Sequence, residues 1–200
     1  MRRATMAVLL FGPMVWSPSG RPAAQTPAAT ESERAACDAL LQTRNLTITY
    51  AGVSATRNGT SYCYVKGILP PAIQFHAQLP LPSNWNGRFL KWGDGGKDGD
   101  LDFADQRVVE GYAVANSNTG HDSGAEPGSS FAYDNRQAEI DFGYRAVHLT
   151  TVAAKTLVRS YYGRAPEYSY FEGCSTGGRQ GLMEAQRYPD DFDGIVAGAP

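Results

Sequence analysis

The stretch Tyr170–Gly181 (YFEGCSTGGRQG) constrains the fold of this 200-residue chain more than any other. An apolar run leads into it, a serine stands between two glycines, and residues 177–187 then have the composition of a helix. A strand that enters a helix directly needs a sharp turn, and Gly173 and Gly177 remove side chains that would clash there. The sequence therefore predicts a strand, a tight turn with Ser175 at its apex, and a helix.

The rest of the chain alternates between strand-like and helix-like segments. The strongest helix prediction is Gln137–Tyr162, in which residues of one face recur every three or four positions, and Gly163 follows as a stop signal. The other predicted helices are 31–42 and 177–187, and the predicted strands are 46–51, 62–69, 73–79, 88–92, 112–116, 168–172 and 194–199. This alternation predicts an α/β fold, a mostly parallel sheet flanked by helices.

Composition and charge narrow the classes of function. The chain has 18 basic and 20 acidic residues, so it offers no basic patch for nucleic acid. No apolar run reaches the roughly 18 residues that a membrane span needs. Arg2 and Arg3, a mostly apolar run and then small residues predict a signal peptide over residues 1–28, with a disordered leader as the alternative. The predicted location is secreted or periplasmic.

Three cysteines fit an oxidising compartment. Cys37 and Cys63 flank a short N-terminal segment and are predicted to form a disulfide, which would stabilise the fold by about 3.5 kcal/mol less any strain. Cys174 is then left without a partner in this sequence.

Ser175 is the candidate nucleophile, with a purely structural turn as the alternative. A serine nucleophile needs a base and an oxyanion hole. The backbone N–H of Thr176 is the expected first oxyanion donor. The glycine-rich loop WGDGG supplies the second, from either Gly95 or Gly96. The segment GDGGKDGD also fits a plain flexible turn, or a calcium loop formed by Asp94, Asp98, Asp100 and Asp102.

The base is the difficulty, because all three histidines precede Ser175. In this type of site the triad acid and the histidine follow the serine. His76 lies in the polar phase of a half-buried strand and His148 on the long helix, so both are expected to be structural or surface residues, whereas His121 follows a strand and could border the site. The acidic residues that follow the serine closely read as a turn: Asp190, Asp191 and Asp193. We therefore expect the triad acid and histidine to lie in a carboxy-terminal part outside this sequence.

Three segments carry a resemblance to a known family: GYAVANSNTGHDS, IDFGYRAVHLTTVAAKTLVRSYYG and YSYFEGCSTGGRQGLMEAQRYPDDFDGIVAGAP. From about Cys37 to Pro200 the chain resembles the tannase and feruloyl esterase family of α/β-hydrolases. The resemblance implies an α/β-hydrolase fold, of which residues 29–200 form the N-terminal part of the catalytic domain, incomplete at the C-terminus. It also implies a secreted serine carboxylesterase that hydrolyses esters of aromatic acids through an acyl-enzyme, on feruloyl, galloyl or terephthalate esters. The alternative is a truncated, non-catalytic homologue.

The resemblance has further implications. It pairs Cys174 with a cysteine beside the catalytic histidine, outside this sequence. It implies a lid, inserted after the last strand here, that shapes the substrate pocket and holds a structural calcium ion; the chemistry itself needs no cofactor or metal. The chain departs from the family at Gly93–Gly96, which reads Gly-Asp-Gly-Gly instead of Gly-Asn-Gly-Gly and adds the charge of Asp94 near the site.

Overall fold

A computed structural model describes residues 29–200, and the predicted signal peptide, residues 1–28, lies outside the described residues. The elements in chain order are α1 (Glu31–Asp38), the 3-10 helix η1 (Ala39–Gln42), β1 (Thr47–Ala55), β2 (Ser61–Leu69), β3 (Ile73–Pro80), β4 (Arg88–Trp92), α2 (Asp105–Val109), β5 (Ala113–Ser117), the 3-10 helix η2 (Ser130–Ala132), α3 (Arg136–Ile140), the π-helix η3 (Asp141–Arg145), α4 (Ala146–Tyr162), β6 (Tyr168–Cys174), α5 (Thr176–Arg187) and β7 (Gly194–Gly198).

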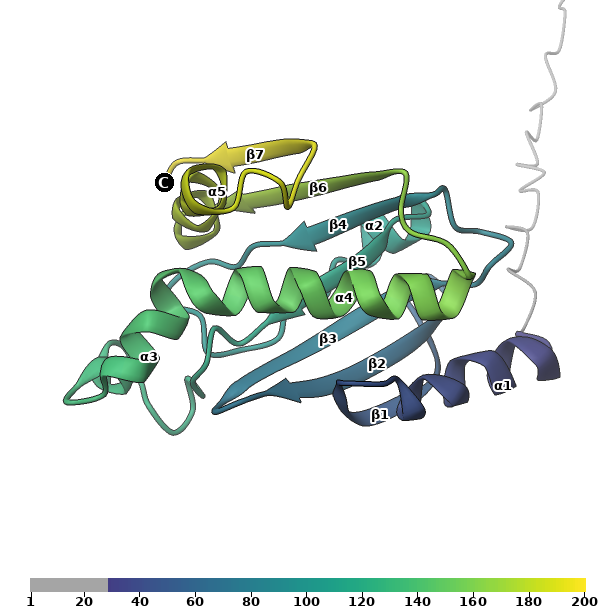
Figure 1. Cartoon of the computed structure of the whole chain (residues 1–200), viewed down its shortest axis with the longest axis horizontal. Helices are drawn as coiled ribbons and strands as arrows, with labels where there is room; N and C mark the ends of the chain where they lie inside the picture. Colours follow the sequence, from purple (N-terminus) through teal and green to yellow (C-terminus); the bar gives the residue numbers. More distant parts are fainter. Residues whose placement is uncertain (1–28) are drawn as a thin grey trace, which may run out of the picture.

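The strands form one seven-stranded sheet in the order β1-β2-β3-β5-β4-β6-β7. The strands β5, β4, β6 and β7 are parallel, whereas β1, β2 and β3 extend the sheet with antiparallel pairings. The parallel part, with its helices, confirms the predicted α/β fold. The carboxyl ends of β4, β6 and β7 point to the same edge, and the N-terminus of α5 starts from that edge (Figure 1).

Helices cover both faces of the sheet. The long helix α4 crosses one face, and α5 packs beside it over β6 and β7 (Figure 1). Alternate residues of a strand point to opposite faces. Phe89 of β4 accordingly joins the core under α4, whereas its neighbour Leu90 packs with Val108 of α2 on the other face.

The disulfide prediction is confirmed. Cys37 and Cys63 form a disulfide bond that joins α1 to β2, and both cysteines are fully buried. The bond fixes the N-terminal helix against the antiparallel end of the sheet, and it agrees with an oxidising compartment. Cys174 is free and exposed.

The predicted single helix Gln137–Tyr162 is interrupted by the π-helical turn η3. A π turn leaves backbone carbonyls without their usual partners in the helix. Arg179 of α5 satisfies two of them, because its guanidinium donates to the carbonyls of Phe142 and Gly143 at 3.1 Å each. A side chain 36 residues further along the chain stabilises the turn, so the helical periodicity could not reveal it.

Two other expectations from the sequence were wrong. The strand β3 was expected to be half-buried, but both of its faces are covered and His76 and Gln78 are fully buried. The short helix α2 was not predicted. It packs on the face of the sheet opposite α4. The side-chain amide of Gln78 donates a hydrogen bond of 3.0 Å to Asp105, the first residue of α2. The polar residues of β3 are therefore partners of an unpredicted helix and loop.

Candidate active site

The predicted strand, turn and helix around Ser175 are present. Ser175 connects β6 to α5 with φ 60° and ψ −118°, and its side chain is exposed. A positive φ is costly for a residue with a side chain, and such strain is typical of functional sites. The backbone is held there because the N–H of Ser175 donates to the carbonyl of Gly198 at 3.0 Å. The serine oxygen is thus presented at the carboxyl edge of the sheet.

The two flanking glycines are required by close backbone contacts. A Cβ atom on Gly173 would lie 2.7 Å from the carbonyl carbon of Gly177. A Cβ on Gly177 would lie 2.8 Å from the carbonyl oxygen of Asp94. Real Cβ atoms do not come this close to backbone atoms, so any larger residue would push the turn and the neighbouring loop apart.

The glycine-rich loop after β4 packs directly on this turn. The N–H of Gly177 donates to the carbonyl of Asp94 at 2.6 Å, and the hydroxyl of Thr176 donates to the carbonyl of Gly96. The loop and the turn share a cleft of about 380 Å³. Its lining residues are Trp92, Gly93, Asp94, Gly95, Asp102, Glu172, Gly173, Cys174, Ser175, Val196 and Gly198.

The cleft distinguishes the candidate oxyanion donors by position. Gly95 lines it together with Ser175, whereas Gly96 does not. The helix α5 begins at Thr176, so the N–H of this residue has no acceptor within the helix. A free amide at a helix N-terminus favours negative charge beside it. The arrangement can therefore stabilise an oxyanion next to the hydroxyl of Ser175.

Buried polar side chains form hydrogen bonds with the glycine-rich loop and the residue before it. The sequence analysis did not identify these side chains. Lys91 is fully buried, and its ammonium donates to the carbonyl of Trp92 at 2.7 Å. Asp94 accepts a hydrogen bond from the amide of Asn116, whose oxygen accepts the N–H of Asp102 at 3.0 Å. Burial lowers the pKa of Lys91 and raises the pKa of Asp94 to about 6. The alternation of β4 would have placed Lys91 on a covered face, but only the fold shows which acidic groups accompany it.

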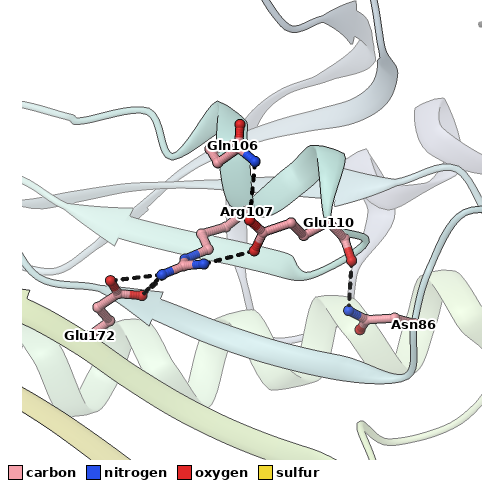
Figure 2. A network of polar contacts seen from close by, with 5 residues as sticks. All are labelled: Asn86, Gln106, Arg107, Glu110 and Glu172. Atoms are coloured by element: carbon pink, nitrogen blue, oxygen red, sulfur yellow. Dashed lines mark hydrogen bonds and ion pairs between the residues drawn. The ribbon is translucent and has the colours of Figure 1, made fainter.

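A second network ties the strand of the nucleophile to α2 on the opposite face of the sheet (Figure 2). Arg107 donates from Nε and Nη2 to the two carboxylate oxygens of Glu172 at 3.0 and 2.9 Å. Its Nη1 also pairs with Glu110 at 2.7 Å. Glu172 lies three residues before Ser175 and lines the cleft. Arg107 and Glu172 are 65 residues apart, so nothing in the local sequence signals this pair.

No histidine of the described part of the chain lines the cleft of Ser175. His76 is buried against Phe103, and its Nε2 lies 2.9 Å from the carbonyl of Asp102. His121 stacks on the ring of Phe131 at 3.9 Å between centroids. His148 contacts Asp191, with its Nδ1 2.7 Å from a carboxylate oxygen. These positions agree with the expectation that His76 and His148 are structural or surface residues, and His121 is buried against Phe131.

The four aspartates of the alternative calcium loop, at positions 94, 98, 100 and 102, line one small pocket together with Gly95, Gly96 and Lys97. Among residues 29–200 they do not bring three ligand atoms within 4.8 Å of one another, and the calcium loop stays a prediction. The one such group in that range is His148, Glu184 and Asp191, whose ligand atoms all lie within 4.8 Å of one another. Burial, with the nearby charge of Asp191, raises the pKa of Glu184 to about 8. The acidic turn after α5 therefore contributes Asp191 to this group, besides connecting α5 to β7.

None of the helices between residues 29 and 200 is long and apolar enough to cross a membrane.

Comparison with known proteins gives the family. A family model described as "Tannase and feruloyl esterase" matches residues 56–200. The probable feruloyl esterase B-2 of Aspergillus flavus is 47% identical over 125 residues, which are 62% of this chain and 23% of the relative. Feruloyl esterase B of Aspergillus niger is 42% identical over 128 residues, which are 62% of this chain and 23% of that protein. The chain thus spans about a quarter of the length of these curated relatives.

Solved structures agree on the fold. The crystal structure of feruloyl esterase B from Aspergillus oryzae matches with a TM-score of 0.72 and 30% identity, over 82% of this chain and 36% of that one. The tannin acyl hydrolase of Aspergillus niger matches with a TM-score of 0.61 and 23% identity, over 82% of this chain and 35% of that one. The fold is that of the α/β-hydrolases. The chain belongs to the tannase and feruloyl esterase family.

Proposed function

We propose that the whole protein is an exported serine carboxylesterase that hydrolyses esters of aromatic carboxylic acids. One observation carries the proposal. Ser175 stands exposed, in a strained backbone conformation, at a glycine-flanked turn that faces the glycine-rich loop across a shared cleft. This is the arrangement in which a serine can attack a carbonyl carbon while backbone amides stabilise the oxyanion.

The proposed reaction has two steps. The oxygen of Ser175 attacks the ester carbonyl, and the N–H groups of Thr176 and Gly95 stabilise the oxyanion. The alcohol then leaves, and water hydrolyses the acyl-enzyme. Each oxyanion donor should contribute about 3 kcal/mol to the transition state. Gly95 is preferred over Gly96 because it borders the same cleft as the serine, while the carbonyl of Gly96 accepts the hydroxyl of Thr176.

The proton acceptor is assigned to a histidine, with its triad acid, outside the sequence given. The support is that none of His76, His121 and His148 lines the cleft and that each contacts another group instead. Cys174, which is exposed beside Ser175, is proposed to form a disulfide bond with a cysteine next to that histidine. The bond would hold the base close to the nucleophile. A lid with structural calcium is likewise assigned to the part outside the sequence.

The substrate class follows from the relatives and the chemistry of the cleft. The matched proteins are named feruloyl esterases and a tannin acyl hydrolase, whose names refer to aromatic acyl groups. Trp92 and Val196 give the cleft an apolar wall on which an aromatic ring can pack. Export is supported by the disulfide between Cys37 and Cys63.

The test uses the longest natural form of the protein, with methyl ferulate and methyl gallate as substrates. The proposal expects turnover of at least one of them, and Ser175→Ala should reduce kcat by at least about 10⁴-fold. The exposed Ser83→Ala is the matched control and should leave kcat unchanged. Turnover that survives Ser175→Ala would refute the nucleophile, and absence of any ester hydrolysis would favour the non-catalytic alternative.

A further inference from the structure

Three potential metal ligands converge at a place that the proposed reaction does not use. They come from three segments: His148 from α4, Glu184 from α5, and Asp191 from the connection between α5 and β7. Their ligand atoms all lie within 4.8 Å of one another. The Nδ1 of His148 and a carboxylate oxygen of Asp191 are already 2.7 Å apart.

The buried carboxyl group of Glu184 is the unexplained member. The residue is 0% exposed, and neither of its carboxylate oxygens has a hydrogen-bond partner among the described residues. A carboxyl group buried without a partner is strongly unfavourable, so such groups in native proteins are almost always paired or bound to a metal.

The nearby lysines do not supply a direct partner, and the neighbouring hydrogen-bonding group is the carboxyl group of Asp191. The ammonium of Lys155 donates to the backbone carbonyl of Asp191 at 2.5 Å, and that of Lys91 donates to the carbonyl of Trp92. Neither ammonium forms an ion pair with Glu184 within 4.0 Å. The carboxylate is thus directed to the same small space as the imidazole and the second carboxylate.

We propose that His148, Glu184 and Asp191 bind a divalent transition-metal ion, with Zn²⁺ as the first candidate. One imidazole nitrogen and two carboxylate oxygens are a ligand set that zinc accepts, with a water molecule in the fourth position. Tetrahedral zinc with bonds of about 2.0–2.2 Å separates its ligands by about 3.3 Å. The atoms of His148 and Asp191 would therefore move apart by about 0.6 Å from their present 2.7 Å.

The site lies away from the proposed reaction. Glu184 lies nine residues after Ser175, which corresponds to about 13 Å along α5. The ring of Tyr188 stacks on His148 at 3.8 Å between centroids and holds the imidazole plane. An ion here would fasten α4, α5 and the approach to β7 at one point. It would thereby brace the helix whose first turn carries the candidate oxyanion donor.

The experiment measures zinc in the full protein directly. The protein is stripped with a chelator, titrated with ZnCl₂ by calorimetry, and its retained metal is counted by elemental analysis after gel filtration. We expect about one zinc ion per chain and a raised Tm on binding. Glu184→Gln and Asp191→Asn should each weaken binding by more than the roughly 10–100-fold that loss of an outer-shell partner costs. Asp190→Asn, an exposed neighbour, is the matched control and should bind as the parent does.

Two results would overturn the proposal. The first is binding of less than a tenth of an equivalent by the folded parent, which would leave a network of ion pairs only. The second is zinc binding that is equal in the parent, Glu184→Gln and Asp191→Asn, which would place the ion elsewhere. Asp191→Asn changes only a partly exposed side chain, so it remains informative if Glu184→Gln does not fold. The absorption spectrum of the Co²⁺ form reports the ligand set independently of stability.

Discussion

Replacement of Gly177 by alanine tests how the glycine-rich loop and the nucleophile turn fit together. The added Cβ would lie 2.8 Å from the carbonyl oxygen of Asp94 and 2.9 Å from the carbonyl carbon of Gly93. Ordinary contacts begin at 3.4 Å, so the loop must move by roughly 0.5 Å. Both opposing atoms belong to the backbone, which cannot rotate away as a side chain would. The hydrogen bond from Gly177 N–H to Asp94, at 2.6 Å, must lengthen as well.

The expected magnitudes follow from this displacement. Overpacking of a tight site costs about 1–3 kcal/mol, and we expect about 2 kcal/mol for Gly177→Ala. For a domain of this size that loss lowers Tm by about 4–8 °C. The displaced segment carries Gly95, and misplacement of a catalytic group by about 1 Å can cost 10²-fold in rate. In the longest natural form, kcat should fall at least about ten-fold.

The assay is thermal unfolding by circular dichroism, followed by ester hydrolysis. Gly143→Ala is the matched control, because a Cβ there meets nothing within 4 Å and its φ is not positive. That helical position should gain about 0.5–1 kcal/mol. If Gly177→Ala melts within about 1 °C of the parent, or hydrolyses esters at the parental rate, the close packing of loop and turn is not what positions the site.

Three further predictions concern the surroundings of the site. Arg107→Met should lower the free energy of unfolding by about 1 kcal/mol, because its ion pair with Glu172 is bidentate but about a third exposed. This loss should shrink at high salt, and a loss of stability that is independent of salt would contradict an electrostatic role. Burial lowers the pKa of His76 to about 4, whereas a histidine of the unfolded chain has a pKa near 6.5. Between these values only the unfolded state binds the proton, so the free energy of unfolding should fall by up to about 3 kcal/mol as the pH drops from 6.5 to 4. His76→Gln should flatten that part of the urea-unfolding profile, and an unchanged slope would show that other groups cause it. The 200-residue chain alone should hydrolyse an aryl acetate no faster than its Ser175→Ala variant, because none of its described histidines lines the cleft; a serine-dependent rate would make His121 the first residue to mutate.

The features that the sequence predicted correctly are those that depend on residues close together in the chain. The apolar run, the two glycines and the following helix predict the turn at Ser175, because each of them acts on its immediate neighbours. The disulfide between Cys37 and Cys63 also followed from few cysteines and their spacing. Most strand positions followed from short runs of apolar residues, and β4 and β5 carry such runs because both of their faces are covered.

The features that the sequence did not reveal depend on contacts between distant segments. The π turn at Asp141–Arg145 is stabilised by Arg179, and the pair of Arg107 and Glu172 forms only when α2 is placed against β6. His76 looked like a surface residue of an alternating strand, but the loop at Asp102 covers it. In each case the partner is supplied by the topology, and periodicity carries no information about it.

The most direct test of the central claim is to locate the acyl group during turnover. The longest natural form is mixed with an activated aryl ester, quenched in acid, digested, and mapped by mass spectrometry. The proposed function predicts one acylated peptide, with the acyl group on Ser175, and no such peptide from Ser175→Ala. Acylation of the adjacent Cys174, or turnover with no acylated residue at this turn, would contradict it.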